Sequence, residues 1–212
     1  MCGIIAISRR KTNRVAPTRE SIEGLLDLEQ SFALKDLTDI KALIEKFLTL
    51  KKELSGVAGI KCLLRDPPFG QYLERICSNL ESEIDQFELT LVSAEFGSDE
   101  LEEINRDLIE LKDLLWHFIY DRVRVAIAIE ELSNGRSSDD SVEVLTSIQE
   151  VLTGIDRLEV RGRDSAGLHI MLVNHGLDLT DPAIRLEITQ RSQDLNYGSG
   201  AVREAGEALS FV

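Results

Sequence analysis

Apolar side chains recur every three or four residues through most of residues 17–134, which is the period of an amphipathic helix. Pro67-Pro68 and Gly97-Ser98 interrupt the pattern. We therefore predict an antiparallel helical bundle over this part of the chain. The apolar stripes are Leu37, Ile40, Ile44, Phe47 and Leu54; Leu73, Ile76, Leu80, Phe87 and Leu91; and Leu101, Ile104, Leu108, Leu111, Leu115 and Phe118.

Shorter patterns flank the helical part. Residues 2–8, Cys-Gly-Ile-Ile-Ala-Ile-Ser, are apolar and β-branched, which predicts a buried strand. Residues 168–173 predict a second strand, and Asp181-Pro182 predicts the start of a helix with Asp181 as its N-cap. We also predict capping boxes at Asp99 with Glu102 and at Asp140 with Glu143. The helix expected after Asp140 carries the stripe Val142, Leu145, Ile148, Leu152, Ile155 and Leu158.

The composition of the 212 residues is globular, with 43% hydrophobic residues and a net charge of −14. An acidic chain is a poor non-specific ligand for nucleic acid, and it lacks the basic cluster that attracts anionic lipid. Residues 81–110 hold eleven acidic residues and one base, Arg106. We interpret this segment as a solvated helix face, and the alternative is a docking surface for a basic partner.

No apolar run approaches the roughly 18 residues of a membrane span, and the first one ends at Arg9-Arg10, too early for a secretory signal. We therefore expect a cytoplasmic protein with reduced thiols. The three cysteines, Cys2, Cys62 and Cys77, are too sparse for a disulfide framework. Neither they nor the three histidines have metal-ligand spacing, so we expect no metal and no cofactor.

Cys2 is the candidate nucleophile. Removal of Met1 would leave a thiol and a free α-amino group on the same Cα. An α-amino group has a pKa of about 7.7–8.0, so it can accept the thiol proton near neutral pH without a histidine. Gly3 allows other backbone to approach closely. The residues therefore predict an N-terminal cysteine nucleophile.

Besides the opening Cys-Gly-Ile, the sequence contains a second motif, Arg157-Leu-Glu-Val-Arg-Gly-Arg-Asp-Ser-Ala-Gly-Leu168. Together they resemble the N-terminal-nucleophile (class II) glutamine amidotransferases. The similarity is closest to the glutamine–fructose-6-phosphate aminotransferases (glucosamine-6-phosphate synthases), which read Arg-Leu-Glu-Tyr-Arg-Gly-Tyr-Asp-Ser-Ala-Gly-Leu. Val160 and Arg163 stand where that branch has tyrosines.

The resemblance implies a glutaminase that releases ammonia from glutamine for transfer to a sugar phosphate. Fructose 6-phosphate is the expected acceptor and glucosamine 6-phosphate the expected product. The implied fold class is α+β, a partial αββα N-terminal-nucleophile hydrolase domain with an inserted α-helical bundle. The implied site residues are the catalytic Cys2, the substrate-binding Arg161 and Gly162, and the turn residues Asp164, Ser165 and Gly167.

The resemblance covers about residues 1–10 and 141–176. We predict a partial amidotransferase domain over residues 1–10 and 141–212, and a helical insertion over 11–140. The family's His-Thr-Arg-Trp segment, which binds the glutamine carboxylate, is not found, nor is its later Asn-Gly oxyanion pair. We therefore expect those residues and the acceptor domain to lie beyond residue 212, and residues 1–212 alone to be inactive.

Two alternatives stay open at this point. The acceptor could instead be of the phosphoribosyl type. In the other alternative, the helical residues 17–134 are a non-catalytic interaction module, and Cys2 is dispensable. The oligomeric state is open as well, a homo-oligomer included.

Overall fold

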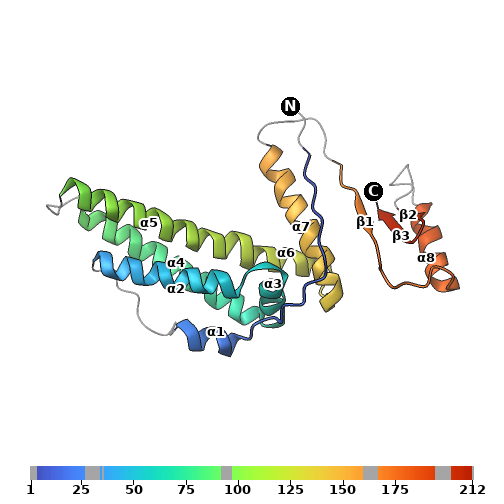
Figure 1. The fold of residues 1–212 in the computed structure, drawn as a ribbon, viewed down its shortest axis with the longest axis horizontal. Coiled ribbons are helices and arrows are strands. Elements are labelled where there is room, and N and C mark those ends of the chain that lie inside the picture. The colour runs from blue at the N-terminus through green and yellow to red at the C-terminus, as the bar shows by residue number, and fades with distance from the viewer. Residues whose placement is uncertain are drawn as a thin grey trace. The chain divides into compact units, whose positions relative to one another are not determined.

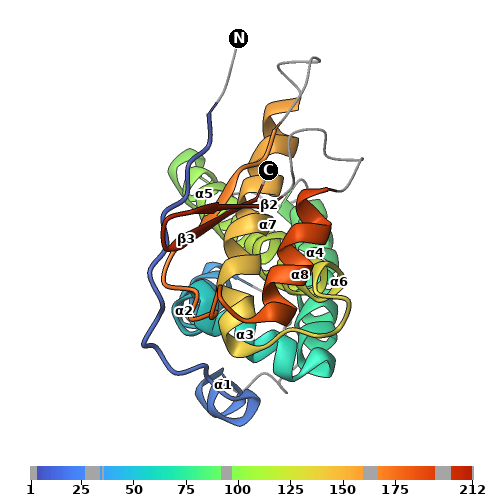
Figure 2. The same cartoon turned by 90° about the vertical axis from the view of Figure 1, so that its right-hand side faces the viewer.

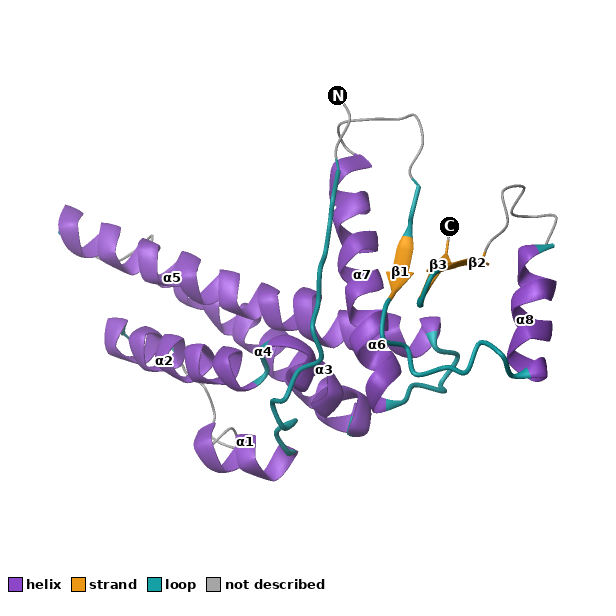
Figure 3. Ribbon diagram, turned by 45° about the vertical axis from the view of Figure 1, so that its right-hand side comes forward, coloured by secondary structure: helices purple, strands orange, loops and turns teal. Residues whose placement is uncertain are grey.

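The computed structural model describes residues 4–26, 34, 36–91, 97–159, 167–193 and 202–211. The chain divides into two compact units. The first, here called the helical unit, is residues 6–150, and the second, the mixed unit, is residues 1–5 with 151–212. Figure 3 shows that helices dominate the described chain and that the strands belong to the mixed unit.

The helical unit contains the predicted bundle. Its long helix α5 packs against both α2 and α4, and the three lie side by side in Figure 1. A π-helical turn, η1, continues α5 directly into α6. The elements are α1 (Arg19–Leu26), α2 (Leu37–Glu53), α3 (Gly56–Arg65), α4 (Pro67–Leu91), α5 (Ser98–Phe118), η1 (Ile119–Val123), α6 (Arg124–Leu132) and α7 (Asp139–Glu159), of which residues 139–150 belong to this unit.

The predicted stripes face one another in a single apolar core, as burial of apolar surface requires. The rings of Phe47 on α2 and Phe118 on α5 meet there, 5.6 Å apart between centroids. Leu101 is the member of the α5 stripe that stays exposed. No helix in the described part of the chain combines the length and apolar character that crossing a bilayer requires.

Both predicted capping boxes are wrong. The N-cap of α5 is Gly97, so Asp99 already lies in the first turn of that helix. Helix α7 begins at Asp139, and its first turn is stabilised by a reciprocal pair of serines. Ser141 N–H donates to Ser138 Oγ at 3.2 Å, and Ser138 N–H donates to Ser141 Oγ at 2.7 Å.

The mixed unit holds a three-stranded antiparallel sheet in the order β1-β3-β2. Its elements are β1 (Ile170–Leu172), α8 (Pro182–Ser192), β2 (Val202–Ala205) and β3 (Ala208–Phe211). Figure 2 shows β2 and β3 as a hairpin, whose tight turn places Gly206 at a φ of 64°. Asp181 caps α8 as predicted, because its Oδ1 accepts Ala183 N–H at 2.7 Å.

The expected αββα fold class is wrong for the described chain. Its strands form one small sheet, and the segment expected as the first strand is irregular where it is described, over residues 4–8. Ile4 is 93% exposed instead of buried. A strand exists only where a neighbour offers a backbone ladder, and Thr12, farther along the same segment, donates its backbone N–H to a side chain of α7 instead.

Candidate functional site

Gly167 is the predicted site residue that the structure describes. It is exposed, and a Cβ there would meet no atom within 4 Å. The structure describes the segment that follows Cys2 and helix α7, which holds the first motif residues, Arg157–Glu159; these two segments are here called the two flanks. The other predicted site residues, Cys2, Arg161, Gly162, Asp164 and Ser165, lie outside the described residues.

In the mixed unit, the two flanks touch at Ile5 and Gly154. A Cβ on Gly154 would lie 2.5 Å from Cδ1 of Ile5, so the missing side chain at this position of α7 makes room for Ile5. Ile5 is three residues after Cys2, and Gly154 is five residues before the end of α7 at Glu159. The contact therefore joins positions that are close in sequence to both motifs.

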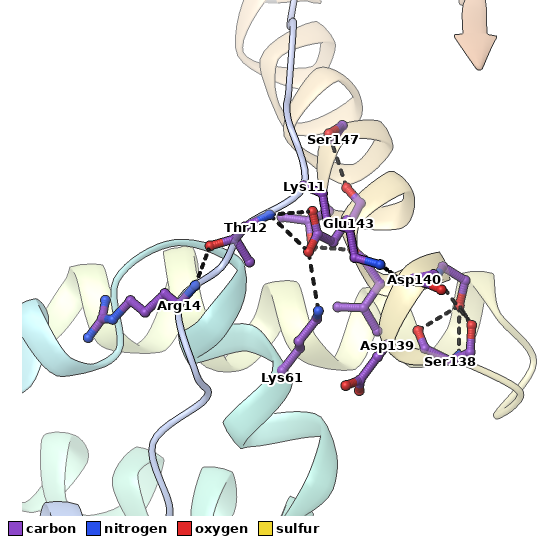
Figure 4. A network of polar contacts seen from close by, with 12 residues as sticks. Lys11, Thr12, Arg14, Lys61, Ser138, Asp139, Asp140, Glu143 and Ser147 are labelled. Atoms are coloured by element: carbon purple, nitrogen blue, oxygen red, sulfur yellow. Dashed lines mark hydrogen bonds and ion pairs between the residues drawn. The ribbon is translucent and has the colours of Figure 1, made fainter. Parts of the chain in front are cut away.

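In the helical unit, residues 9–14, here called the N-terminal strap, run along the first part of α7 (Figure 4). Arg9 Nε donates to Ser147 Oγ at 2.8 Å, and its Nη2 lies 2.6 Å from Glu150 Oε2. Farther along the strap, the Thr12 amide meets Glu143. Residue numbers rise along the strap as they fall along α7, so the two segments are antiparallel.

Glu143 is the central acceptor for the strap. Thr12 N–H donates to both its carboxylate oxygens, at 3.2 Å to Oε1 and 3.0 Å to Oε2. Lys61 Nζ from α3 lies 3.3 Å from Oε1. The two side chains of this ion pair are only 10% and 9% exposed, so the charges satisfy each other away from bulk water.

Exposed ion pairs surround this buried one. Lys11 Nζ lies 2.7 Å from Asp140 Oδ1, and its hydrogen bond lowers the pKa of Asp140. Arg65 Nη2 from α3 contacts both carboxylate oxygens of Asp139, at 3.0 and 2.7 Å. Pairs this exposed contribute little to stability. The buried pair is therefore the contact in this network whose removal should matter.

Arg14 attaches the other end of the strap to the C-terminal end of α2. Its Nη2 donates to the carbonyls of Lys52 and Glu53 at 2.9 and 2.8 Å. Its Nη1 donates to the carbonyl of Ser55 at 3.2 Å. The last carbonyls of a helix lack partners within the helix, so a guanidinium is a suitable donor for them.

The two described cysteines are poor nucleophiles. Cys62 on α3 and Cys77 on α4 are buried, as the sequence predicted. Burial raises the pKa of Cys62 to about 11 and that of Cys77 to about 12, with smaller additions from acidic neighbours. At neutral pH both are thiols, and the thiolate is the nucleophilic form.

The π-helical turn η1 carries a second group of polar side chains. His117 Nδ1 lies 3.1 Å from Asp121 Oδ2, while His117 Nε2 and Arg122 Nε are buried without a hydrogen-bond partner. Burial lowers the pKa of His117 and of Arg122, and Asp121 opposes both shifts. Within the described ranges, no cluster of His, Cys, Asp and Glu is placed to hold a metal ion.

Sequence reasoning missed Lys61 and assigned Glu143 to a capping box. A signal was present, because Lys61 is the one charged residue in the apolar run 56–64. A charge among apolar helical residues indicates either an exposed position or a buried partner. The partner itself is 82 residues away in sequence, so no local pattern could name it.

Comparison with known protein families, curated proteins and solved structures finds no match to this chain. The similarity to the amidotransferases therefore depends on the two motifs alone.

Proposed function

We propose that this chain carries the nucleophile of a glutamine-dependent amidotransferase, with Cys2 attacking the side-chain amide of glutamine. The contact of Ile5 with Gly154 is the observation that supports this proposal most directly. Three residues span at most about 11 Å of extended chain. The five residues from Gly154 to the end of α7 rise about 8 Å. Cys2 and Arg161 are thus only three and seven residues along the chain from this contact, which supports a shared site for the two motifs.

The proposed reaction begins after removal of Met1, when the α-amino group of Cys2 takes the proton of its thiol. The thiolate attacks the amide carbon of glutamine, and the tetrahedral oxyanion collapses to a thioester. The amide nitrogen takes that proton and leaves as ammonia. Water then hydrolyses the thioester to glutamate and restores the thiol. In this proposal Arg161 and Gly162 line the glutamine pocket, while Asp164, Ser165 and Gly167 shape its turn.

The ammonia is proposed to pass to a sugar phosphate in the cytoplasm, with fructose 6-phosphate as the acceptor and glucosamine 6-phosphate as the product. Val160 and Arg163 stand where the similar branch has two tyrosines, so the proposed glutamine pocket differs from that branch at these positions. The chemistry at Cys2 is the same for either acceptor. The first test therefore concerns the nucleophile and not the sugar.

The test is covalent labelling with a glutamine analogue that carries an electrophilic diazoketone in place of the amide. The full-length protein that carries residues 1–212 is treated near pH 7.5, digested, and mapped by peptide mass spectrometry. We expect the label on Cys2, protection by excess glutamine, and a peptide that begins at Cys2 instead of Met1. Cys62 and Cys77 should stay unmodified, because both are buried thiols with raised pKa values.

Cys62→Ala and Cys77→Ala are the matched controls, and they should label like the parent protein. Cys2→Ala should abolish the label. Equal modification of all three cysteines, or labelling that glutamine does not slow, would contradict the proposal. Retention of Met1 in a protein that turns over glutamine would contradict the role of the α-amino group.

A further inference from the structure

The long helix that runs from α5 through η1 into α6 (Figure 1) exposes large apolar side chains along one face. Two isoleucines and two aromatic residues on this face are between 39% and 62% exposed, and an exposed acid and an exposed base lie among them. Large apolar patches on the surface of a soluble protein mark interaction sites. The row, here called the α5–α6 stripe, consists of Ile109, Asp113, Trp116, Tyr120, Arg124 and Ile127.

Two ring contacts hold the middle of the stripe in place. The rings of Trp116 and Tyr120 stack with their centroids 4.9 Å apart and their planes 16° from parallel. The guanidinium of Arg124 lies over the Tyr120 ring, 4.1 Å from its centre. Tryptophan, tyrosine and arginine dominate the binding energy of protein interfaces, and side chains that are already held in place lose little entropy on binding. The middle of the stripe therefore has both the residue types and the order of a binding surface.

The order of side chains along the stripe is self-complementary. It reads apolar, acidic, aromatic, aromatic, basic, apolar, and in the reverse direction only the acid and the base exchange places. The two isoleucines each lie seven residues outside the aromatic pair, and Asp113 and Arg124 lie three and four residues outside it. Two antiparallel copies of the stripe therefore match isoleucine with isoleucine, ring with ring and acid with base.

The two charges of the stripe are too far apart to pair within one chain. Asp113 and Arg124 are eleven residues apart on a continuous helix, which separates them by about 16 Å along its axis. A two-fold axis through the midpoint of the aromatic pair brings Asp113 of each copy to Arg124 of the other, so that both copies use the same surface. A parallel arrangement in register would instead place like charges together. The charge pattern thus favours a second copy of this chain, in the antiparallel direction.

We propose that this chain forms a two-fold symmetric dimer in which the α5–α6 stripes of two copies pack antiparallel. The aromatic pairs of the two copies meet at the centre, two ion pairs between Asp113 and Arg124 flank them, and the isoleucines close the ends. Each copy carries a net charge of −14, so the dimer forms against a general repulsion, which salt at about 0.15 M screens beyond about 8 Å. The proposal is independent of the reaction at Cys2.

Association of residues 1–212 can be measured by two readouts on the same samples. Sedimentation equilibrium gives the mass over a concentration series from about 1 µM to about 1 mM, which spans weak to moderate association. Trp116 is the one tryptophan of the chain, so its fluorescence reports on the stripe itself. We expect the mass to double with concentration, and the Trp116 emission to move to shorter wavelength with the same midpoint, because the ring leaves water.

Charge reversal tests the antiparallel pairing. Asp113→Arg and Arg124→Asp each place like charges together twice in a dimer, so each should raise the dissociation constant about ten- to a hundredfold. A mixture of the two variants should dimerise again, because every arginine at these positions then meets an aspartate. Glu81→Arg, at an exposed position of α4, is the matched control and should dimerise like the parent.

Truncation of the aromatic pair tests the centre of the interface. Trp116→Ala and Tyr120→Ala should each raise the dissociation constant at least about tenfold, as loss of a central aromatic anchor does. Leu89→Ala, at an exposed apolar position of α4, should leave it unchanged. Circular dichroism shows whether each variant keeps its helices, and the charge-reversed mixture decides the matter if an aromatic variant unfolds.

Three results would overturn the proposal. The first is a monomer at every concentration. The second is a dimer whose Trp116 emission does not change on association, since such a dimer forms through another surface. The third is a mixture of Asp113→Arg and Arg124→Asp that associates no better than either variant alone.

Discussion

Cys62 and Cys77 show how strongly the bundle core alters a single side chain. Burial raises the pKa of Cys62 from 9.0 to about 11 and that of Cys77 to about 12. In the unfolded chain both thiols regain an ordinary pKa, so the unfolded state loses these two protons first as the pH rises. The thiol forms therefore stabilise the fold fully below pH 9.0, and this contribution is lost as the pH rises towards 11 and 12.

We predict a difference in the pH dependence of stability between the parent chain and Cys62→Ala/Cys77→Ala. The free energy of unfolding of the parent should fall more steeply above about pH 9, because the double variant has no thiol to ionise in these positions. Urea denaturation between pH 7 and pH 10.5 measures both curves. Tyrosines and lysines titrate in both proteins and cancel in the comparison. Curves that stay parallel over this range would show that neither thiol is buried as described.

At the scale of single residues, the sequence predicts which side chains are buried better than it predicts which side chains they contact. Cys62 and Cys77 lie in periodic apolar runs, and both are buried as predicted. Lys61 and Glu143 were not recognised as a pair, because helical periodicity describes a residue's own element and not the residue it meets. The site residues Cys2 and Arg161 lie outside the described residues, so their roles stay predictions from the motifs.

The turn between α2 and α3 depends on two glycines, Gly56 and Gly59. A Cβ on Gly59 would overlap the backbone carbonyl of Leu54, which cannot move away as a flexible side chain could. Gly56 begins α3 with a φ of 63°, where a side chain would be strained. Two helices of the core therefore depend on glycine for their approach.

Gly59→Ala should destabilise the chain by about 1–3 kcal/mol or more, since the added methyl group meets backbone. Gly24→Ala on α1 is the matched control, because a Cβ there meets nothing within 4 Å. Alanine has the higher helix propensity, so the control should be neutral or stabilising by up to about 1 kcal/mol. Thermal denaturation compares the two. An equal effect of both substitutions would mean that the α2–α3 turn is looser than described.

At the scale of elements, the sequence predicts the helices more completely than the strands. Each long apolar stripe of period 3.6 became a helix of the bundle, because a helix satisfies its backbone hydrogen bonds internally. Of the predicted strand over residues 168–173, residues 170–172 form β1, which pairs with β3 from far along the chain. Residues 4–8 have the same apolar character and form no strand, because none of the described strands pairs with them.

The two units of the chain differ in how much apolar surface they remove from water. The large core cluster runs from Ile22 to Val142 and lies entirely in the helical unit. In the described part of the mixed unit, the buried apolar residues are Val202, Ala208 and Leu209. Met171 in the middle of β1 is 57% exposed. Burial of apolar area dominates folding stability, so the helical unit should be the more stable of the two.

Amide hydrogen exchange on residues 1–212 should show this order directly. The amides of residues 104–118 donate the internal hydrogen bonds of α5, and one face of this helix is buried in the core. They should therefore exchange only through rare unfolding of the helical unit. Amides of residues 170–172 belong to a three-residue strand in a small sheet, and sheets of this size are marginal without a supporting layer. We expect the protection factors of residues 104–118 to exceed those of residues 170–172 by at least about tenfold, because weakly packed elements open at a lower free-energy cost. Residues 40–50 on α2, which pack against α5, are the internal control and should exchange with it. Stronger protection of β1 than of α5 would mean that the core of this chain lies in the sheet and not in the helical bundle.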